Sequence, residues 1–196
     1  MSIPRRLSVA GFTSAIQNAI LPIGDSKTAG QGDTNPPPQG ENGYPYYLTQ
    51  ALGANWKETP RIGVGGATVA SLKARCDADI AARYDAPKYI LFDLGANDVS
   101  SMPSQATFEA NYGYMLDAHH ERFPNARIGI ALPGRQGFDT NCNTLAGYIA
   151  NVIAARSSYC FTGPDERIVL KGSDNYATYT SDGIHPTPAG YSALAT

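Results

Sequence analysis

Short apolar runs alternate along the chain with longer segments in which apolar residues recur every three or four positions. The short runs have the length and composition of buried strands, at residues 20–24, 61–64, 88–94, 127–132 and 167–170. Segments with helical periodicity lie between them, at residues 44–52, 68–84, 107–123 and 144–156. Strands that alternate with helices are joined by crossovers and run parallel. The pattern therefore predicts an α/β fold, a three-layer α/β/α sandwich around a parallel sheet of about five strands.

One domain accounts for the whole chain. Its 196 residues suit a single core, and neither an internal repeat nor a second boundary is evident, so we predict one domain over residues 1–196, with 1–19 as an N-terminal extension. Residues 31–43, rich in Pro, Gly, Asn and Gln, predict an exposed loop over the edge of the sheet where ligands bind. Thr187 and Pro188 predict the start of a last helix. Either that helix is short or the natural chain continues beyond Thr196.

Composition and charge narrow the possible partners. Hydrophobic residues make up 42% of the chain and charged residues 16%, which is typical of a folded domain, and the net charge of −2 without a basic run argues against nucleic-acid binding. The chain has no apolar stretch of about 20 residues, so no membrane span is predicted. Arg5 and Arg6 precede a segment broken by polar residues, which argues against a signal peptide. We expect a cytoplasmic enzyme, or a secreted or particle-associated module whose export signal lies outside this chain.

The three cysteines, Cys76, Cys142 and Cys160, are odd in number and widely spaced, so they do not form a disulfide framework. We interpret them as buried free thiols. The alternative is that Cys142 and Cys160 pair in an oxidising compartment.

Ser26 is the candidate nucleophile. It follows the first predicted strand through Gly24 and Asp25, which places its hydroxyl at the carboxyl edge of the sheet, where free backbone N–H groups bind anions. A serine hydroxyl is a weak nucleophile and needs a base to accept its proton.

His185 is the candidate base. It lies in a loop near the C-terminus, three residues after Asp182, with Gly183 between them to allow a tight turn. That spacing lets the carboxylate hydrogen-bond the imidazole and fix its tautomer. The other two histidines, His119 and His120, are adjacent in a predicted helix, face different directions and are interpreted as solvated surface residues.

Two further strand ends offer donors for the oxyanion of an ester-hydrolysis intermediate. Residues 63–68, Gly-Val-Gly-Gly-Ala-Thr, expose backbone N–H groups, and Gly95-Ala-Asn-Asp98 offers the side-chain amide of Asn97. The first segment lacks the Gly-Lys-Ser/Thr ending of a P-loop and the spacing of a dinucleotide fingerprint.

Taken together, these segments resemble the GDSL/SGNH hydrolase family, whose motifs they follow in order from residue 24 to residue 186. The resemblance implies a flavodoxin-like sandwich without a bound cofactor or metal. It implies Ser26 as nucleophile, His185 as general base and then acid, and Asp182 as the orienting partner. The oxyanion hole would consist of the backbone N–H groups of Ser26 and Gly66 and the side chain of Asn97. The rival α/β-hydrolase plan needs a Gly-x-Ser-x-Gly elbow, which the chain lacks.

The chain departs from the family pattern at two positions. Lys27 stands where the family usually has an apolar residue, and we interpret it as a helix lysine that points outward. Arg61 stands where many members have asparagine, which leaves the local turn network open. Asp25 and Asp98 are assigned to holding turns together.

The implied substrates are small-molecule or carbohydrate esters, with short-chain carboxylic esters and O-acetyl groups fitting best. Sugar rings suit tyrosine faces, and five tyrosines are expected to rim the site: Tyr44, Tyr46, Tyr47, Tyr176 and Tyr179. Thioesterase activity stays open, since the same three residues serve both reactions. Two rival hypotheses are a metal-dependent hydrolase using His119 or His120 and a non-catalytic module of a phage or cell-surface protein.

Overall fold

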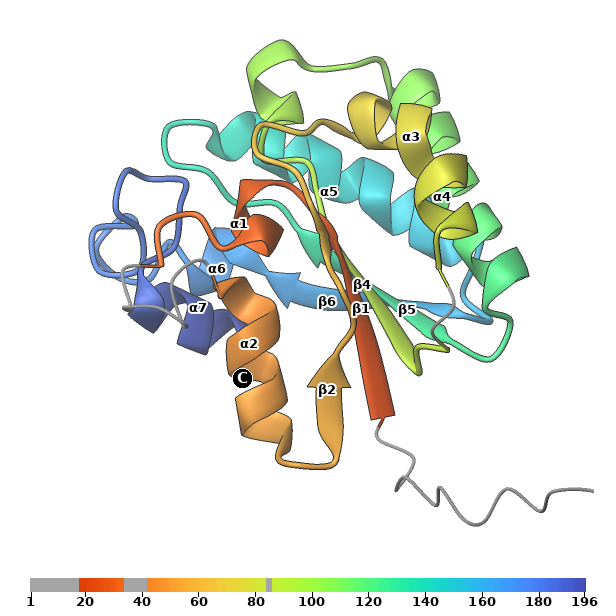
Figure 1. Ribbon diagram of the computed structural model, residues 1–196. Coiled ribbons are helices and arrows are strands. Elements are labelled where there is room, and N and C mark those ends of the chain that lie inside the picture. Colours follow the sequence, from red (N-terminus) through yellow and green to blue (C-terminus); the bar gives the residue numbers. More distant parts are fainter. Residues whose placement is uncertain (1–17, 34–41, 84–85) are drawn as a thin grey trace, which may run out of the picture.

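The computed structural model describes residues 18–33, 42–83 and 86–196. Within them six parallel strands form one sheet, whose main path runs β2-β1-β4-β5-β6 (Figure 1). The strands are β1 (Asn18–Gly24), β2 (Trp56–Glu58), β3 (Ile62–Gly63), β4 (Tyr89–Asp93), β5 (Arg127–Leu132) and β6 (Cys160–Asp165). The predicted N-terminal extension lies outside the described residues as far as residue 17, and residues 34–41 of the predicted loop also lie outside them.

β2 and β3 are two parts of one interrupted strand beside β1. Asn18 to Ile20 pair with β2, and Ile23 and Gly24 pair with β3. Pro60 lies in the break, where its missing N–H removes a donor to the ladder. Counted as one strand, β2 and β3 give the flavodoxin-like order 2-1-3-4-5, in which ligands bind outside the carboxyl ends of the strands where the order reverses. That point lies between β1 and β4.

Helices cover both faces of the sheet, which confirms the predicted sandwich (Figure 1). One face carries α3 (Val69–Ala81), α4 (Gln105–Arg122) and α5 (Asp139–Ala154), and the other carries α2 (Gly43–Leu52) and α7 (Pro188–Leu194). The short helices α1 (Ser26–Ala29), η1 (Asp98–Ser101) and α6 (Glu166–Val169) follow β1, β4 and β6. Thr187 caps α7 as expected, since its side chain accepts the N–H of Gly190.

Two buried clusters fill the sandwich. The larger joins the sheet to α3, α4 and α5, and it includes all three cysteines as buried free thiols. The smaller lies between the sheet, α2 and α7 and contains Tyr44, Leu170, Tyr176, Tyr191 and Leu194. The expectation that all five tyrosines rim the site is therefore wrong for Tyr44 and Tyr176, which are core residues. In the described parts of the chain, no helix combines the length and the apolar character that crossing a membrane requires.

The predicted strand at residues 167–170 is wrong. This segment belongs to α6, whose start is capped by Asp165 through a hydrogen bond from the Arg167 N–H. The three apolar residues Ile168, Val169 and Leu170 fit one helical turn as well as a strand, and only Leu170 of them is buried. The actual edge strand is β6, whose Gly163 and Pro164 argue against a strand from sequence but are tolerated at a sheet edge.

His119 is a core residue and does not lie on the helix surface as expected. It is 3% exposed, and burial lowers the pKa of its imidazole to about 4. It continues the buried stripe of α4, which includes Phe108, Tyr112, Met115 and His119. His120 is half-buried and stacks on Tyr159. Neither histidine belongs to a metal-binding group of three or more His, Cys, Asp or Glu side chains among the described residues.

Candidate active site

Ser26, His185 and Asp182 form a hydrogen-bonded chain at the carboxyl edge of the sheet. Nε2 of His185 lies 3.0 Å from Oγ of Ser26, although the two residues are 159 positions apart. Nδ1 of the same ring lies 2.7 Å from Oδ2 of Asp182. With the ring proton on Nδ1, the imidazole donates to the carboxylate and its Nε2 accepts the serine hydroxyl. The three residues that the sequence singled out are thus brought together.

The loop that carries Asp182 and His185 is held by its own hydrogen bonds. Oδ1 of Asp182 accepts the backbone N–H groups of His185 at 2.8 Å and Ile184 at 3.0 Å. Gly183 has a φ of +82°, in the left-handed region that favours glycine, and its N–H donates to Oγ1 of Thr180. These hydrogen bonds lower the pKa of Asp182 against the opposing effect of its partial burial, so its carboxylate stays charged in moderately acidic solution.

Ser26 is the first residue of the one-turn helix α1 and is 4% exposed. Asp25 caps this helix, because its Oδ1 accepts the N–H of Lys27 at 3.0 Å. Gly24 is required by close packing: a Cβ there would lie 2.1 Å from Oγ1 of Thr28 and 2.3 Å from the carbonyl oxygen of Asp93. The turn between β1 and α1 is therefore tightly packed and presents Ser26 at the switch point.

The two predicted oxyanion loops lie beside this turn. Gly66 is exposed, has a φ of +72° and has open space where a side chain would be. Nδ2 of Asn97 donates to the carbonyl oxygen of Ala67 at 3.0 Å and to Oδ2 of Asp25 at 3.4 Å. Asn97 thus connects the loop after β4, the loop that contains Gly66 and the cap of α1.

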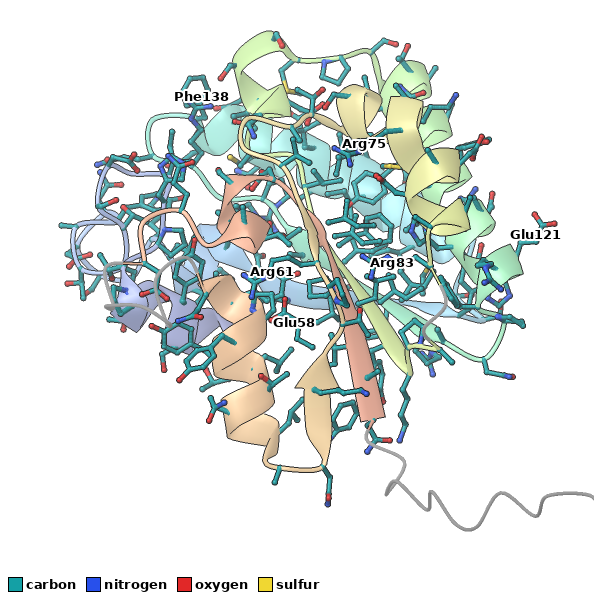
Figure 2. All side chains as sticks on the ribbon, in the orientation of Figure 1. Glu58, Arg61, Arg75, Arg83, Glu121 and Phe138 are labelled. Carbon is teal, nitrogen blue, oxygen red and sulfur yellow. The ribbon has the colours of Figure 1, made fainter. Side chains whose placement is uncertain are left out.

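Asp98 and Arg61 hold the surrounding turns. As expected, Asp98 accepts the N–H of Val69 at the start of α3. Arg61 forms a bidentate ion pair with Glu58 and donates to the carbonyl oxygen of Thr28 in α1 at 3.1 Å. Figure 2 shows Glu58 and Arg61 facing each other between α2 and the sheet. Arginine at this position therefore supports the end of α1.

Lys27 does not point outward as expected but is fully buried beneath α1. Its Nζ lies 3.0 Å from Oδ1 of Asp93, the last residue of β4, and donates a hydrogen bond to Oε2 of Glu166 at the start of α6. α1 is a single turn inserted against the ends of the strands, so this position faces the sheet. The sequence offers no local signal for the pairing, because Glu166 lies 139 residues away.

Burial also changes the acidity of the carboxyl groups beneath Ser26. It raises the pKa of Asp25 to about 7, an effect that the nearby Lys27 ammonium opposes. Burial and the charge of Asp93 raise the pKa of Glu166 to about 8, again against the effect of Lys27. Both groups therefore keep a proton in the folded protein at pH values where an exposed carboxyl group has lost it.

The free energy of unfolding is expected to fall as pH rises from 7 to 8. The ordinary pKa values are 3.8 for Asp25 and 4.5 for Glu166, so the stability that their native protons contribute is fully present below those values. It is lost as pH rises through about 7 and about 8. In this window His119 is mainly neutral in the folded and the unfolded protein, because the pKa of its imidazole is about 4 when folded and 6.5 ordinarily. The expected slope in urea titrations is about 1 kcal/mol per pH unit.

Glu166→Gln should flatten that slope, because it removes the group that titrates last. Glu121→Gln on the exposed side of α4 is the matched control and should keep the wild-type slope (Figure 2). Equal slopes in wild type and Glu166→Gln would contradict the assignment of this proton to Glu166.

Comparison with known proteins agrees with the fold and with the family resemblance. Residues 23–193 match the model of the GDSL-like lipase/acylhydrolase family. A search of curated proteins found no significant match.

Solved structures with the same fold are similar over nearly the whole chain. LAE5, an alpha/beta hydrolase enzyme from the metagenome of Lake Arreo, has a TM-score of 0.73 at 18% identity, over 91% of both chains. A member of the lipolytic G-D-S-L family from Veillonella parvula has a TM-score of 0.69 at 16% identity, over 90% of this chain and 93% of that one. The SGNH-hydrolase family esterase AlinE4 has a TM-score of 0.66 at 22% identity, over 91% and 90%. Because the family model matches most of its length, the chain belongs to the GDSL-like lipase/acylhydrolase family.

Proposed function

We propose that the protein is a serine hydrolase that cleaves short-chain carboxylic esters through an acyl-enzyme. The observation that carries the proposal is the chain of hydrogen bonds from Ser26 through His185 to Asp182, at 3.0 and 2.7 Å. A nucleophile, a base and an orienting carboxylate within hydrogen-bond reach are the arrangement that acyl transfer to serine requires.

In this mechanism the Ser26 hydroxyl attacks the ester carbonyl while Nε2 of His185 accepts its proton. The ester C–O bond then breaks, and the imidazolium returns the proton to the leaving alcohol. Water attacks the acyl-enzyme by the same route, releases the acid and restores Ser26. Asp182 stabilises the imidazolium and keeps the ring oriented. The backbone N–H groups of Ser26 and Gly66 hold the negative charge on the carbonyl oxygen together with the amide of Asn97, which exchanges its long 3.4 Å contact with Asp25 for the oxyanion.

Asn97→Ala is expected to lower kcat on the order of 10²-fold, equivalent to about 3 kcal/mol, because the oxyanion loses one donor. The measurement is steady-state hydrolysis of 4-nitrophenyl acetate. The matched control is Asn141→Ala, since Asn141 also donates to a loop carbonyl, that of Val99 at 2.8 Å, but has no role in the proposed hole. Wild-type kcat in Asn97→Ala would remove this residue from the oxyanion hole.

The position of an apolar cavity supports short acyl groups in the substrate. A cavity of about 330 Å³ lies between α2, α7 and the sheet, and it is lined by Tyr44, Leu91, Phe161 and Leu194 among others. Ser26, His185 and Asp182 are not among its lining residues, so it does not extend the site into a pocket for a long chain. This supports acetyl and other short esters over long-chain fats.

Tyrosines near the His185 loop support an O-acetylated carbohydrate among these esters. Residues 31–33 pack against that loop, since a Cβ on Gly32 would lie 2.9 Å from Cβ of His185. Tyr47 lies next to this segment, because its hydroxyl contacts Oδ1 of Asp33 at 3.4 Å. Tyr46, Tyr47 and Tyr179 are half-buried, so part of each side chain is accessible, although the Tyr47 ring stacks on Tyr191. Accessible tyrosine rings can stack on sugar rings.

The deciding experiment is a substrate screen with Ser26→Ala as the blank. It compares 4-nitrophenyl esters of increasing acyl length, acetylated sugars and an acetyl thioester. We expect kcat/KM to be highest for acetyl esters and to fall with acyl length. Highest activity on long acyl chains would contradict the short-chain assignment, and preference for the thioester would identify a thioesterase. No hydrolysis above the blank on any substrate would favour a non-catalytic module.

A further inference from the structure

The residue after the nucleophile carries a charge in a place where charges are costly. Lys27 has no exposed surface, and its ammonium is paired with Asp93 and Glu166, which are 3% and 0% exposed. Removing an ammonium and two acidic side chains from water is unfavourable, and apolar side chains of the same volume usually serve stability as well or better. The cluster therefore calls for an explanation other than stability.

The helix that carries Ser26 cannot hold its own geometry. α1 has only four residues, and a helix this short is unstable unless contacts from elsewhere fix it. Asp25 holds its start and Arg61 holds its end through the Thr28 carbonyl group. Lys27 supplies the contact that runs beneath the helix, from its middle to the ends of other strands.

The partners of Lys27 reach the other parts of the proposed active site. Asp93 ends β4, and the loop that contains Asn97 follows directly. Oε2 of Glu166 accepts the Lys27 ammonium and also the backbone N–H of Gly134, after β5, at 2.9 Å. Through these contacts, the Lys27 ammonium links the carboxyl ends of four strands, β1, β4, β5 and β6.

The same loop after β5 continues to the catalytic histidine. Two residues beyond Gly134, the backbone N–H of Gln136 donates to the carbonyl oxygen of Gly183 at 2.9 Å. The side chain of Gln136 donates to the carbonyl oxygen of Asn175 in the preceding part of the loop that carries Asp182 and His185. The path from Lys27 through Glu166 and Gly134 therefore ends beside the base.

We propose that Lys27 is a positioning residue for the reaction: its buried ammonium, tied to Asp93 and Glu166, sets the place of Ser26 relative to the loops of Asn97 and His185. The inference rests on the proposed function, in which Ser26 is the nucleophile. A hydroxyl displaced by about 1 Å from its base and from the oxyanion donors reacts on the order of 10²-fold more slowly. Lys27 touches no substrate, so its effect falls on the chemical step and leaves binding almost unchanged.

The test replaces Lys27 with methionine, which keeps the length of the side chain and removes its charge. For 4-nitrophenyl acetate we expect kcat to fall about 10- to 100-fold while KM changes less than about 3-fold. A fluorophosphonate probe, which needs Ser26 activated by His185 but no ester site, should label the variant more slowly by a similar factor. Both reactions are measured well below the melting temperature of the variant.

A second variant separates positioning from stability. Lys27→Met leaves Asp93 and Glu166 without their cation and lowers the melting temperature. The double variant Lys27→Met/Glu166→Gln removes the negative charge that Glu166 carries above pH about 8, so in that range the melting temperature should recover in part while kcat stays low. Leu116→Ala, a buried substitution in α4 on one covered face of the sheet, is the control for lost stability and should keep wild-type kcat.

The possible results distinguish a failure of the inference about Lys27 from a failure of the proposed function. Wild-type kcat in folded Lys27→Met, or kcat that recovers together with the melting temperature in the double variant, overturns the inference and leaves the proposed function intact. If Lys27→Met does not fold, the single variant Glu166→Gln tests the inference. We expect its kcat to be about 3- to 10-fold lower than that of the wild type at unchanged KM. A wild-type kcat in Glu166→Gln overturns the inference. If the wild-type protein neither hydrolyses esters nor reacts with the probe, the proposed function is overturned, and the positioning role of Lys27 is overturned with it.

Discussion

Replacing Ser26 with alanine is expected to lower kcat for 4-nitrophenyl acetate by at least about 10⁴-fold, since the variant cannot form the acyl-enzyme. His185→Ala should have an effect of the same order, because without the imidazole at 3.0 Å the hydroxyl has no acceptor for its proton. Residues that act as one unit are not additive, so the double variant should be no slower than either single variant.

Matched controls make this prediction specific. Ser158→Ala replaces an exposed serine that follows α5, and His120→Ala replaces the half-buried histidine on α4. Both should keep kcat within about 2-fold of wild type, as substitutions away from the reacting atoms usually do. A folded Ser26→Ala protein that retains more than a tenth of wild-type turnover would rule out Ser26 as the nucleophile.

Asp182→Ala is expected to lower kcat on the order of 10³-fold. The carboxylate does two things: its Oδ2 orients the imidazole at 2.7 Å, and its Oδ1 accepts the backbone N–H of His185 at 2.8 Å. Half of the Asp182 side chain is exposed, so water replaces part of its hydrogen bonding, and the loss is smaller than for Ser26.

Asp182→Asn distinguishes the two roles of Asp182. Its amide oxygen still accepts the loop N–H groups, but its amide nitrogen faces Nδ1 of His185 as a donor and favours the wrong tautomer. We therefore expect the loop to stay intact, judged by an unchanged melting temperature, while kcat falls as far as in Asp182→Ala. Asp174→Ala, an exposed position of the same loop, is the control. A loss of less than about 10-fold in both Asp182 variants would mean that His185 is oriented by other groups.

The elements that the pattern predicted best are those whose burial is uniform along their length. The apolar run at residues 127–132 has the bounds of β5, because an internal strand of a parallel sheet is covered on both faces. α5 starts at Asp139, before the predicted residue 144, because its first turn is mainly polar and only Cys142 in it continues the buried face. Strand β2 alternates in character over only three residues, too few for periodicity to reveal.

His119 shows a signal that is present in the sequence but easily misassigned. Its spacing continues the stripe of Phe108, Tyr112 and Met115, so helical periodicity places it inside. Its polarity argues for the surface, but the ring packs against Phe92 of β4, and its Nδ1 is satisfied by the carbonyl oxygen of Met115, one turn earlier in the same helix, at 2.8 Å.

Local sequence determined the α/β class and the order of its main elements, because periodicity and turn chemistry act over a few residues. The three residues of the proposed triad came from the local Asp182–His185 spacing together with the order of the family motifs along the chain. Only the tertiary structure decided where Lys27 points, which segment forms the edge strand, and that Ser26 and His185 meet across 159 positions. The physical reason is that a buried charge is tolerated only beside its partners, and those of Lys27, Asp93 and Glu166, come together only when the ends of separate strands meet at one edge of the sheet.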